Sequence, residues 1–200
     1  METMDANEVA LLRELLVTTD WPERTDEFAR RLRGSTRDPG GLMLLGGSAD
    51  SEPWHLAAHL DDESRYAGLP ALAPTLVRWS PPPGAPAHLR VGLDRLREAR
   101  RGQTLLVVTP ETAPVPLLER VDDARRTGAT ILAMDRGDRE LRGLAHAALS
   151  VPGEQPLLSF DGAQHLVSSA AGQSGEPARR GLRDRLARFL DLVSGPARVD

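Results

Sequence analysis

The sequence predicts one α/β domain in which a parallel sheet lies between two layers of helices. Five short apolar segments alternate with stretches of helical periodicity. Strands that are separated by helices pair in parallel through crossover connections. The chain has 200 residues, which is enough to bury a sizeable single core. We therefore expect a three-layer αβα sandwich with extra helices at both ends.

The N-terminal residues 1–34 are expected to form a helical extension of two helices. Leu12 and Leu16 lie on one apolar face of the first helix, and Phe28 and Leu32 lie on one face of the second. The segment 35–41 that follows is rich in glycine, proline and polar residues, which is typical of a turn.

The central residues 35–172 are expected to form the α/β domain. Continuous apolar runs are typical of buried parallel strands. The expected strands are 42–45, one within 71–79, 105–108, 131–134 and 149–151. The expected helices are 53–60, an arginine-rich helix over 86–101, 117–126, 139–147 and 161–171.

The C-terminal residues 173–200 are expected to carry one more amphipathic helix, over 177–193. Its apolar face would pack either on the α/β domain or on a second copy of the chain in a two-fold dimer. The sequence does not separate these two arrangements.

Composition excludes several classes of function. The chain has no cysteine, and all 25 basic residues are arginine. Cysteine-bound metals, thiolate nucleophiles, Schiff-base lysines and Walker-type phosphate loops are therefore excluded. The net charge of −4 disfavours nucleic acid as a partner. No apolar run is long enough to span a bilayer, and the acidic start is unlike a signal peptide, so we expect a cytoplasmic protein without a cofactor.

A glycine-rich turn follows the first predicted strand. Ligands of open parallel sheets bind outside the carboxyl ends of the strands, which is where Gly46, Gly47 and Ser48 would lie. Glycine also occurs in such turns for conformational reasons alone. Asp50 or Ser51 is the expected N-cap of the next helix.

Three segments resemble the SIS (sugar isomerase) family. Residues 105–112 read Leu-Leu-Val-Val-Thr-Pro-Glu-Thr, where the family has a strand followed by Ser/Thr-x-Ser-Gly-x-Thr. Residues 124–129 read Ala-Arg-Arg-Thr-Gly-Ala, and the family ends its next helix with Lys-x-x-Gly-Ala. Residues 144–152, Leu-Ala-His-Ala-Ala-Leu-Ser-Val-Pro, are similar to the family's Leu-Ala-x-x-Ala-Asp segment and last strand.

The resemblance implies a flavodoxin-like strand order 2-1-3-4-5, a homodimer and a site for a phosphorylated sugar. The ligand-binding residues that it implies are Gly46, Gly47, Ser48, Thr109, Glu111 and Thr112. The loop after the third strand departs from the family, however. Glu111 stands at the position of a phosphate-binding serine, and Pro114, which has no N–H, replaces the final threonine. A carboxylate repels a phosphate dianion, so the phosphate pocket is rebuilt or lost.

Two residues are candidates for catalysis. Glu111 could act as the general base of an aldose–ketose isomerisation, or could simply stabilise a helix N-terminus. His165 stands where some sugar isomerases use a histidine to open the sugar ring, although a histidine among apolar neighbours is more often a half-buried polar residue.

Two other histidines are spaced as a metal-binding pair. His55 and His59 are four residues apart and would share one face of a helix. No motif nominates a third ligand, and the His-Glu-x-x-His pattern of metalloproteases is absent because Leu56 follows His55. A packing role is therefore favoured, and no metal is expected.

The sequence leaves two functions open. The first is a non-catalytic SIS-like domain, a sensor of a carbohydrate derivative or a regulatory protein with a protein partner. The second is a divergent sugar-phosphate isomerase in which Glu111 and His165 transfer protons. The altered loop after the third strand favours the first.

Overall fold

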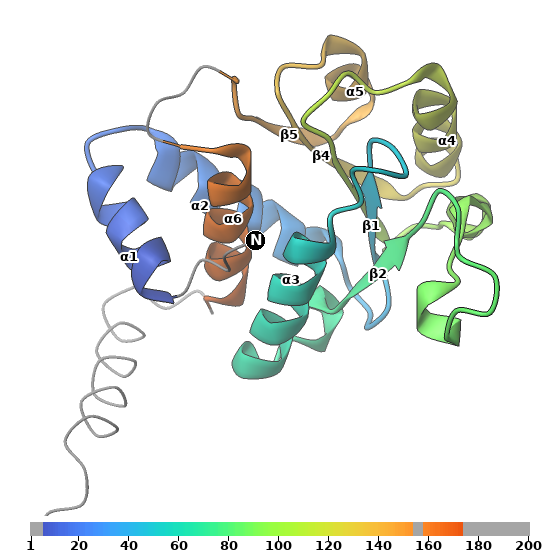
Figure 1. Ribbon diagram of the computed structural model, residues 1–200, viewed down its shortest axis with the longest axis horizontal. Helices are drawn as coiled ribbons and strands as arrows, with labels where there is room; N and C mark the ends of the chain where they lie inside the picture. Colours follow the sequence, from blue (N-terminus) through green and yellow to red (C-terminus); the bar gives the residue numbers. More distant parts are fainter. Residues whose placement is uncertain (1–5, 154–157, 174–200) are drawn as a thin grey trace, which may run out of the picture.

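The computed structural model describes residues 6–153 and 158–173. Five parallel strands form one sheet in the order β2-β1-β3-β4-β5 (Figure 1). The strands are β1 (Leu42–Gly46), β2 (Pro74–Val77), β3 (Thr104–Val108), β4 (Thr130–Asp135) and β5 (Ala147–Ser150). The fold class and the strand order 2-1-3-4-5 are thus confirmed.

Helices cover both faces of this sheet (Figure 1). The α-helices are α1 (Ala6–Leu15), α2 (Trp21–Ser35), α3 (Trp54–Ala67), α4 (Val115–Arg126), α5 (Arg139–Leu144) and α6 (Phe160–Gly172). Three short 3₁₀ helices also occur, η1 (Pro70–Leu72), η2 (Ala87–Leu89) and η3 (Leu93–Glu98). Helices α2, α3 and α6 pack on one face, and α4, α5 and η3 pack on the other.

The strands alternate between two apolar cores, as parallel strands buried on both faces must. In β1, Leu42 and Leu44 contact the core under α2, α3 and α6, whereas Met43 and Leu45 contact the core under α4 and η3. All five residues of β1 and of β3 are buried. This double burial explains why the strands read as unbroken apolar runs.

The arginine-rich helix expected over 86–101 is wrong. This segment instead forms η2 and η3, separated by an extended stretch at Val91 and Gly92. Gly92 forms an isolated parallel bridge with Arg78, whose amide donates to the carbonyl of Val91. Pairing with the end of β2 therefore interrupts the helix, although Leu89, Leu93 and Leu96 have a spacing that a helix also shows.

Smaller differences concern the boundaries of elements. Helix α3 continues seven residues beyond the expected end at Leu60, to Ala67, and Gly68 ends it with a left-handed backbone (φ 65°). Strand β5 begins two residues earlier than expected and follows directly on the shorter α5. The helix expected over 177–193 lies outside the described residues. None of the described helices has the length and apolar character needed to cross a membrane.

Candidate functional site

Two glycines at the carboxyl end of β1 allow close backbone packing. A Cβ on Gly46 would lie 2.1 Å from the carbonyl oxygen of Ser51, and one on Gly47 would lie 2.3 Å from Oγ1 of Thr109. Both glycines are buried, and neither has a positive φ. Close approach of the neighbouring loops, rather than an unusual turn conformation, therefore requires glycine at both positions.

The turn after these glycines is stabilised by two serines. The amide of Ser48 donates to Oγ of Ser51, and the two hydroxyls are 3.0 Å apart. The expectation that Asp50 or Ser51 caps the next helix is wrong, because the N-cap of α3 is Pro53 and no side chain bonds its first turn. Ser51 instead uses its hydroxyl to close the turn. The half-buried Ser48 stays a predicted ligand-binding residue.

Polar groups of the loop after β3 form hydrogen bonds within the loop itself. Thr109 is fully buried, and its hydroxyl donates to the carbonyl of Glu111 and accepts from the Glu111 amide. Glu111 and Thr112 are exposed at the surface of the loop. Thr109 therefore fixes the shape of the loop, while Glu111 and Thr112 are open to solvent and stay predicted ligand-binding residues.

A carboxylate accepts a hydrogen bond from one backbone amide of this loop. Oδ2 of Asp138 accepts from the amide of Ala113 at 2.7 Å, while Oδ1 caps the N-terminus of α5. Two further positions of the loop, Pro110 and Pro114, have no N–H, and neither does Pro116 in the first turn of α4. The loop thus offers a phosphate few amides and two negative charges nearby, those of Glu111 and Asp138.

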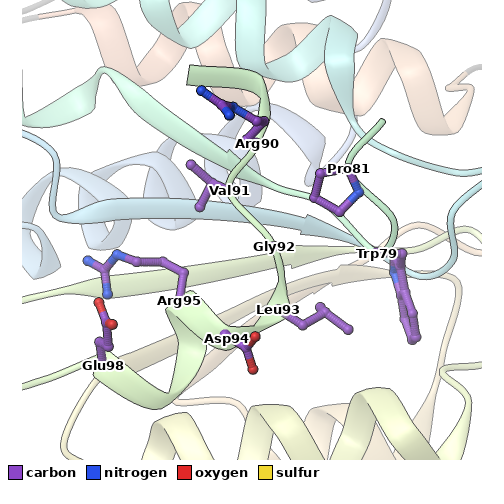
Figure 2. Close-up of a pocket in the computed structure, with 9 residues that line it drawn as sticks. All are labelled: Trp79, Pro81, Arg90, Val91, Gly92, Leu93, Asp94, Arg95 and Glu98. Atoms are coloured by element: carbon purple, nitrogen blue, oxygen red, sulfur yellow. The ribbon is translucent and has the colours of Figure 1, made fainter. Parts of the chain in front are cut away.

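An open pocket of about 530 Å³ lies beside the carboxyl end of β2, which is within the usual size range of small-molecule sites. Trp79 lines it, and its Nε1 donates to the carbonyl of Gly46 at 2.9 Å. Figure 2 shows Trp79 at one end of the pocket and Arg95 and Glu98 at the other, with Asp94 and Leu93 between them. An aromatic face with charged groups opposite suits a polar ligand that has one apolar side. Sequence reasoning missed this pocket.

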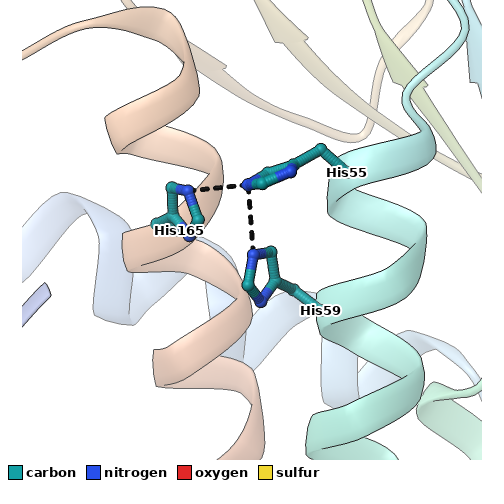
Figure 3. Close-up of side chains that lie close together, drawn as sticks. All are labelled: His55, His59 and His165. Carbon is teal, nitrogen blue, oxygen red and sulfur yellow. Dashed lines mark hydrogen bonds between the residues drawn. The ribbon is translucent and has the colours of Figure 1, made fainter. Parts of the chain in front are cut away.

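Three histidines converge between α3 and α6 (Figure 3). Nε2 of His55 lies 2.8 Å from Nε2 of His165 and 3.1 Å from Nε2 of His59. The three rings meet edge to face, with centroids 4.4 to 4.5 Å apart. His55 and His59 are half-buried on α3, and His165 is buried on α6.

Burial lowers the pKa of two histidines of this cluster. It lowers the pKa of His165 to about 4, and repulsion from His59 and His55 acts in the same direction. Burial, followed by repulsion from His55, also lowers the pKa of His59. Both are therefore neutral imidazoles at pH 7, the form in which histidine binds metal ions.

In the structure, His165 lies next to His55 and His59, although the sequence made them candidates for different roles. The spacing of His55 and His59 suggested a pair, and His165 was a candidate for ring opening, but nothing in the sequence joined them. Helix α6 packs on α3 and supplies the third imidazole. Glu111, the other catalytic candidate, is exposed on the loop between β3 and α4 and is not part of this cluster.

The fold, though not the sequence, matches known structures. No family model matches the chain, and no curated protein sequence matches it. A proposed phosphosugar isomerase from Silicibacter pomeroyi superposes with a TM-score of 0.52 at 16% identity, covering 92% of this chain and 52% of the other. A proposed sugar-binding protein from Salmonella typhimurium superposes with a TM-score of 0.53 at 21% identity, with coverages of 91% and 52%.

These similarities show that the chain has the fold of sugar isomerase-type (SIS) proteins, as the sequence resemblance implied. The chain spans about half the length of both structures. At this level of identity the similarity shows the fold alone.

Proposed function

We propose that the chain is a SIS-type domain that binds a carbohydrate derivative without isomerising it. The observation that carries this proposal is the state of the loop after β3. Its Glu111 and Ala113 amides are already hydrogen-bonded, and Pro114 offers none to a ligand. An isomerase needs a fixed phosphate to position the reacting carbons, so a loop without a phosphate cradle supports binding rather than turnover.

The Trp79 pocket is the place where we propose that the sugar binds. A sugar ring has an apolar face that an aromatic side chain can cover, and hydroxyl groups that Asp94, Arg95 and Glu98 can bond. The pocket lies outside the carboxyl end of the edge strand β2, and Trp79 connects it to Gly46 at the end of β1, one of the two strands that flank the switch point of the sheet.

The test is binding and turnover measured on the same preparation. Thermal unfolding and calorimetry are recorded with neutral sugars, amino sugars and their phosphates. We expect one sugar class to raise the midpoint in a dose-dependent way, because a ligand of the native state stabilises it by about 2.7 kcal/mol at a hundredfold excess over Kd. We expect no gain from the phosphate group and no isomerisation.

Variants locate the ligand. Asp94→Asn and Glu98→Gln should weaken sugar binding without lowering the unfolding midpoint, since both residues are exposed. Glu119→Gln, an exposed carboxylate on α4 outside the pocket, is the matched control. Isomerase turnover that disappears in Glu111→Gln would overturn the proposal and establish the alternative, a divergent sugar-phosphate isomerase.

A regulatory role and a homodimer belong to the same proposal and are supported by the resemblance to the SIS family. Sedimentation of the purified chain tests the homodimer, and sedimentation of its mixture with a protein partner, with and without the bound sugar, tests the regulatory role. We expect a dimer, and we expect ligand binding to change its affinity for a protein partner rather than any reaction rate.

A further inference from the structure

We propose that His55, His59 and His165 form a binding site for one divalent transition-metal ion of the class to which Zn²⁺ belongs. The site lies between α3 and α6 and is separate from the Trp79 pocket, so it does not depend on the proposed sugar-binding function.

Protons alone cannot satisfy the hydrogen bonding of this cluster. A ring nitrogen of histidine carries either one proton or one lone pair, and so makes one well-aligned hydrogen bond. Nε2 of His55, however, has two nitrogen neighbours, at 2.8 and 3.1 Å. At least one of these contacts lacks a well-directed hydrogen. A cation between the three nitrogens accepts all three lone pairs at once and resolves the conflict.

The spacing of the nitrogens is close to the one that a bound metal ion requires. Zinc binds histidine nitrogen at about 2.0–2.1 Å with tetrahedral angles, which places two ligand nitrogens about 3.3 Å apart. The two His55 contacts are close to this separation, and all three ligand atoms lie within 4.8 Å of one another. Small side-chain movements therefore suffice to bring three nitrogens to one ion.

Two packed helices support the three imidazoles. His55 and His59 are one turn apart on α3, and their imidazoles project from one face toward α6 (Figure 3). Leu56 and Leu60 of α3 and Leu166 and Val167 of α6 are buried in the same core. The cluster is thus held by the packing of two helices rather than by loops.

The donor set selects the kind of metal. Imidazole favours Zn²⁺, Cu²⁺, Ni²⁺ and Co²⁺, whereas Mg²⁺ and Ca²⁺ require oxygen ligands. Within residues 6–153 and 158–173 the ligand group comprises the three histidines alone. Three protein ligands leave one tetrahedral position for water or for an oxygen of a small ligand.

The test uses the full chain after dialysis against a chelator. Titration with Zn²⁺ or Co²⁺ should show one strong site, a dose-dependent rise of the unfolding midpoint and, for Co²⁺, intense visible bands of a tetrahedral complex. Mg²⁺ should do none of this. X-ray absorption of the zinc-loaded chain should show about three imidazole ligands.

Variants identify the ligands. His55→Gln, His59→Gln and His165→Gln should each weaken zinc binding by more than the roughly 10–100-fold that loss of an outer-shell partner costs. His88→Gln is the control, because His88 is exposed in η2 and outside the cluster. Its affinity should equal that of the unchanged chain.

Three results would overturn the proposal: no zinc binding by the folded chain, equal binding by the three cluster variants, or an absorption spectrum without imidazole ligands. The spectrum is recorded on the unchanged chain, so the proposal is decided even if a cluster variant fails to fold.

Discussion

Arg78 and Glu52 form an ion pair that is almost removed from solvent. Nε of Arg78 lies 2.8 Å from Oε2 of Glu52, and the two side chains are only 16% and 4% exposed. The guanidinium also lies over the ring of Trp54, 4.8 Å from its centroid. The pair therefore ties the start of α3 to the end of the edge strand β2.

Loss of one member of this pair should destabilise the chain. Glu52→Gln leaves a buried guanidinium without its counter-charge, which costs about 3 kcal/mol. We expect the double variant Glu52→Gln with Arg78→Met to lose less than Glu52→Gln alone, measured by denaturant unfolding. Asp61→Asn is the control, because the Asp61–Arg65 pair is more exposed and should contribute less than about 1 kcal/mol. Equal losses for the two pairs would contradict this prediction.

Alanine at Gly46 or Gly47 should destabilise the turn after β1. The new methyl group would overlap the Ser51 carbonyl or the Thr109 side chain. Because both neighbours are packed, we expect a loss of about 2 kcal/mol or more in unfolding free energy. Gly34→Ala on α2 has open space around its Cβ and should raise stability by about 0.5–1 kcal/mol. A Gly46→Ala or Gly47→Ala variant as stable as the unchanged chain would show that these loops yield easily.

Arg33 of α2 should hold the end of α6 in place. Its Nη1 donates to the carbonyls of Ala170, Ala171 and Gln173 at the C-terminal end of α6, where the last carbonyls lack i+4 donors, and the Ala170 carbonyl also accepts from the amide of Gln173. Arg33→Met should lower stability by about 2 kcal/mol, the scale of charged hydrogen bonds, and should speed amide exchange in the last turn of α6. The exposed Arg30→Met is the control and should change neither quantity.

The sheet could be predicted because each strand is marked by the pattern of its own residues. Strands β1, β3 and β4 are buried on both faces, so each reads as an apolar run bounded by turn residues, and the predicted bounds lie within one residue of the observed ones. The conformation of segment 86–101 could not be predicted in this way, because the pairing of Gly92 with Arg78 depends on a strand elsewhere in the chain. Helical spacing of leucines does not reveal such a long-range contact.

The candidate sites also combine features that the local sequence predicts with features that depend on tertiary packing. The spacing of His55 and His59 showed a shared helix face, but the approach of His165 over 110 positions of sequence depends on how α6 packs on α3. The Trp79 pocket could not be predicted from the sequence for a similar reason, since its walls come from the end of β2 and from η3. Conversely, the departure of Glu111 and Pro114 from the family pattern could be read directly, because the resemblance fixes their places in one loop.

Restoring that loop should restore affinity for phosphate. Glu111→Ser removes a negative charge and adds a hydroxyl, and Pro114→Thr adds a hydroxyl and an N–H at the start of α4. One charge-assisted hydrogen bond contributes about 1.5–3 kcal/mol, so the double variant should bind inorganic phosphate at least about tenfold more tightly than the unchanged chain. Calorimetry with phosphate measures this, and Thr112→Ser, which adds no donor, is the control. Because Asp138 still holds the Ala113 amide, adding Asp138→Asn should increase the affinity further. Unchanged affinity in the folded double variant would mean that neither the Glu111 charge nor the missing donors keep phosphate from this loop.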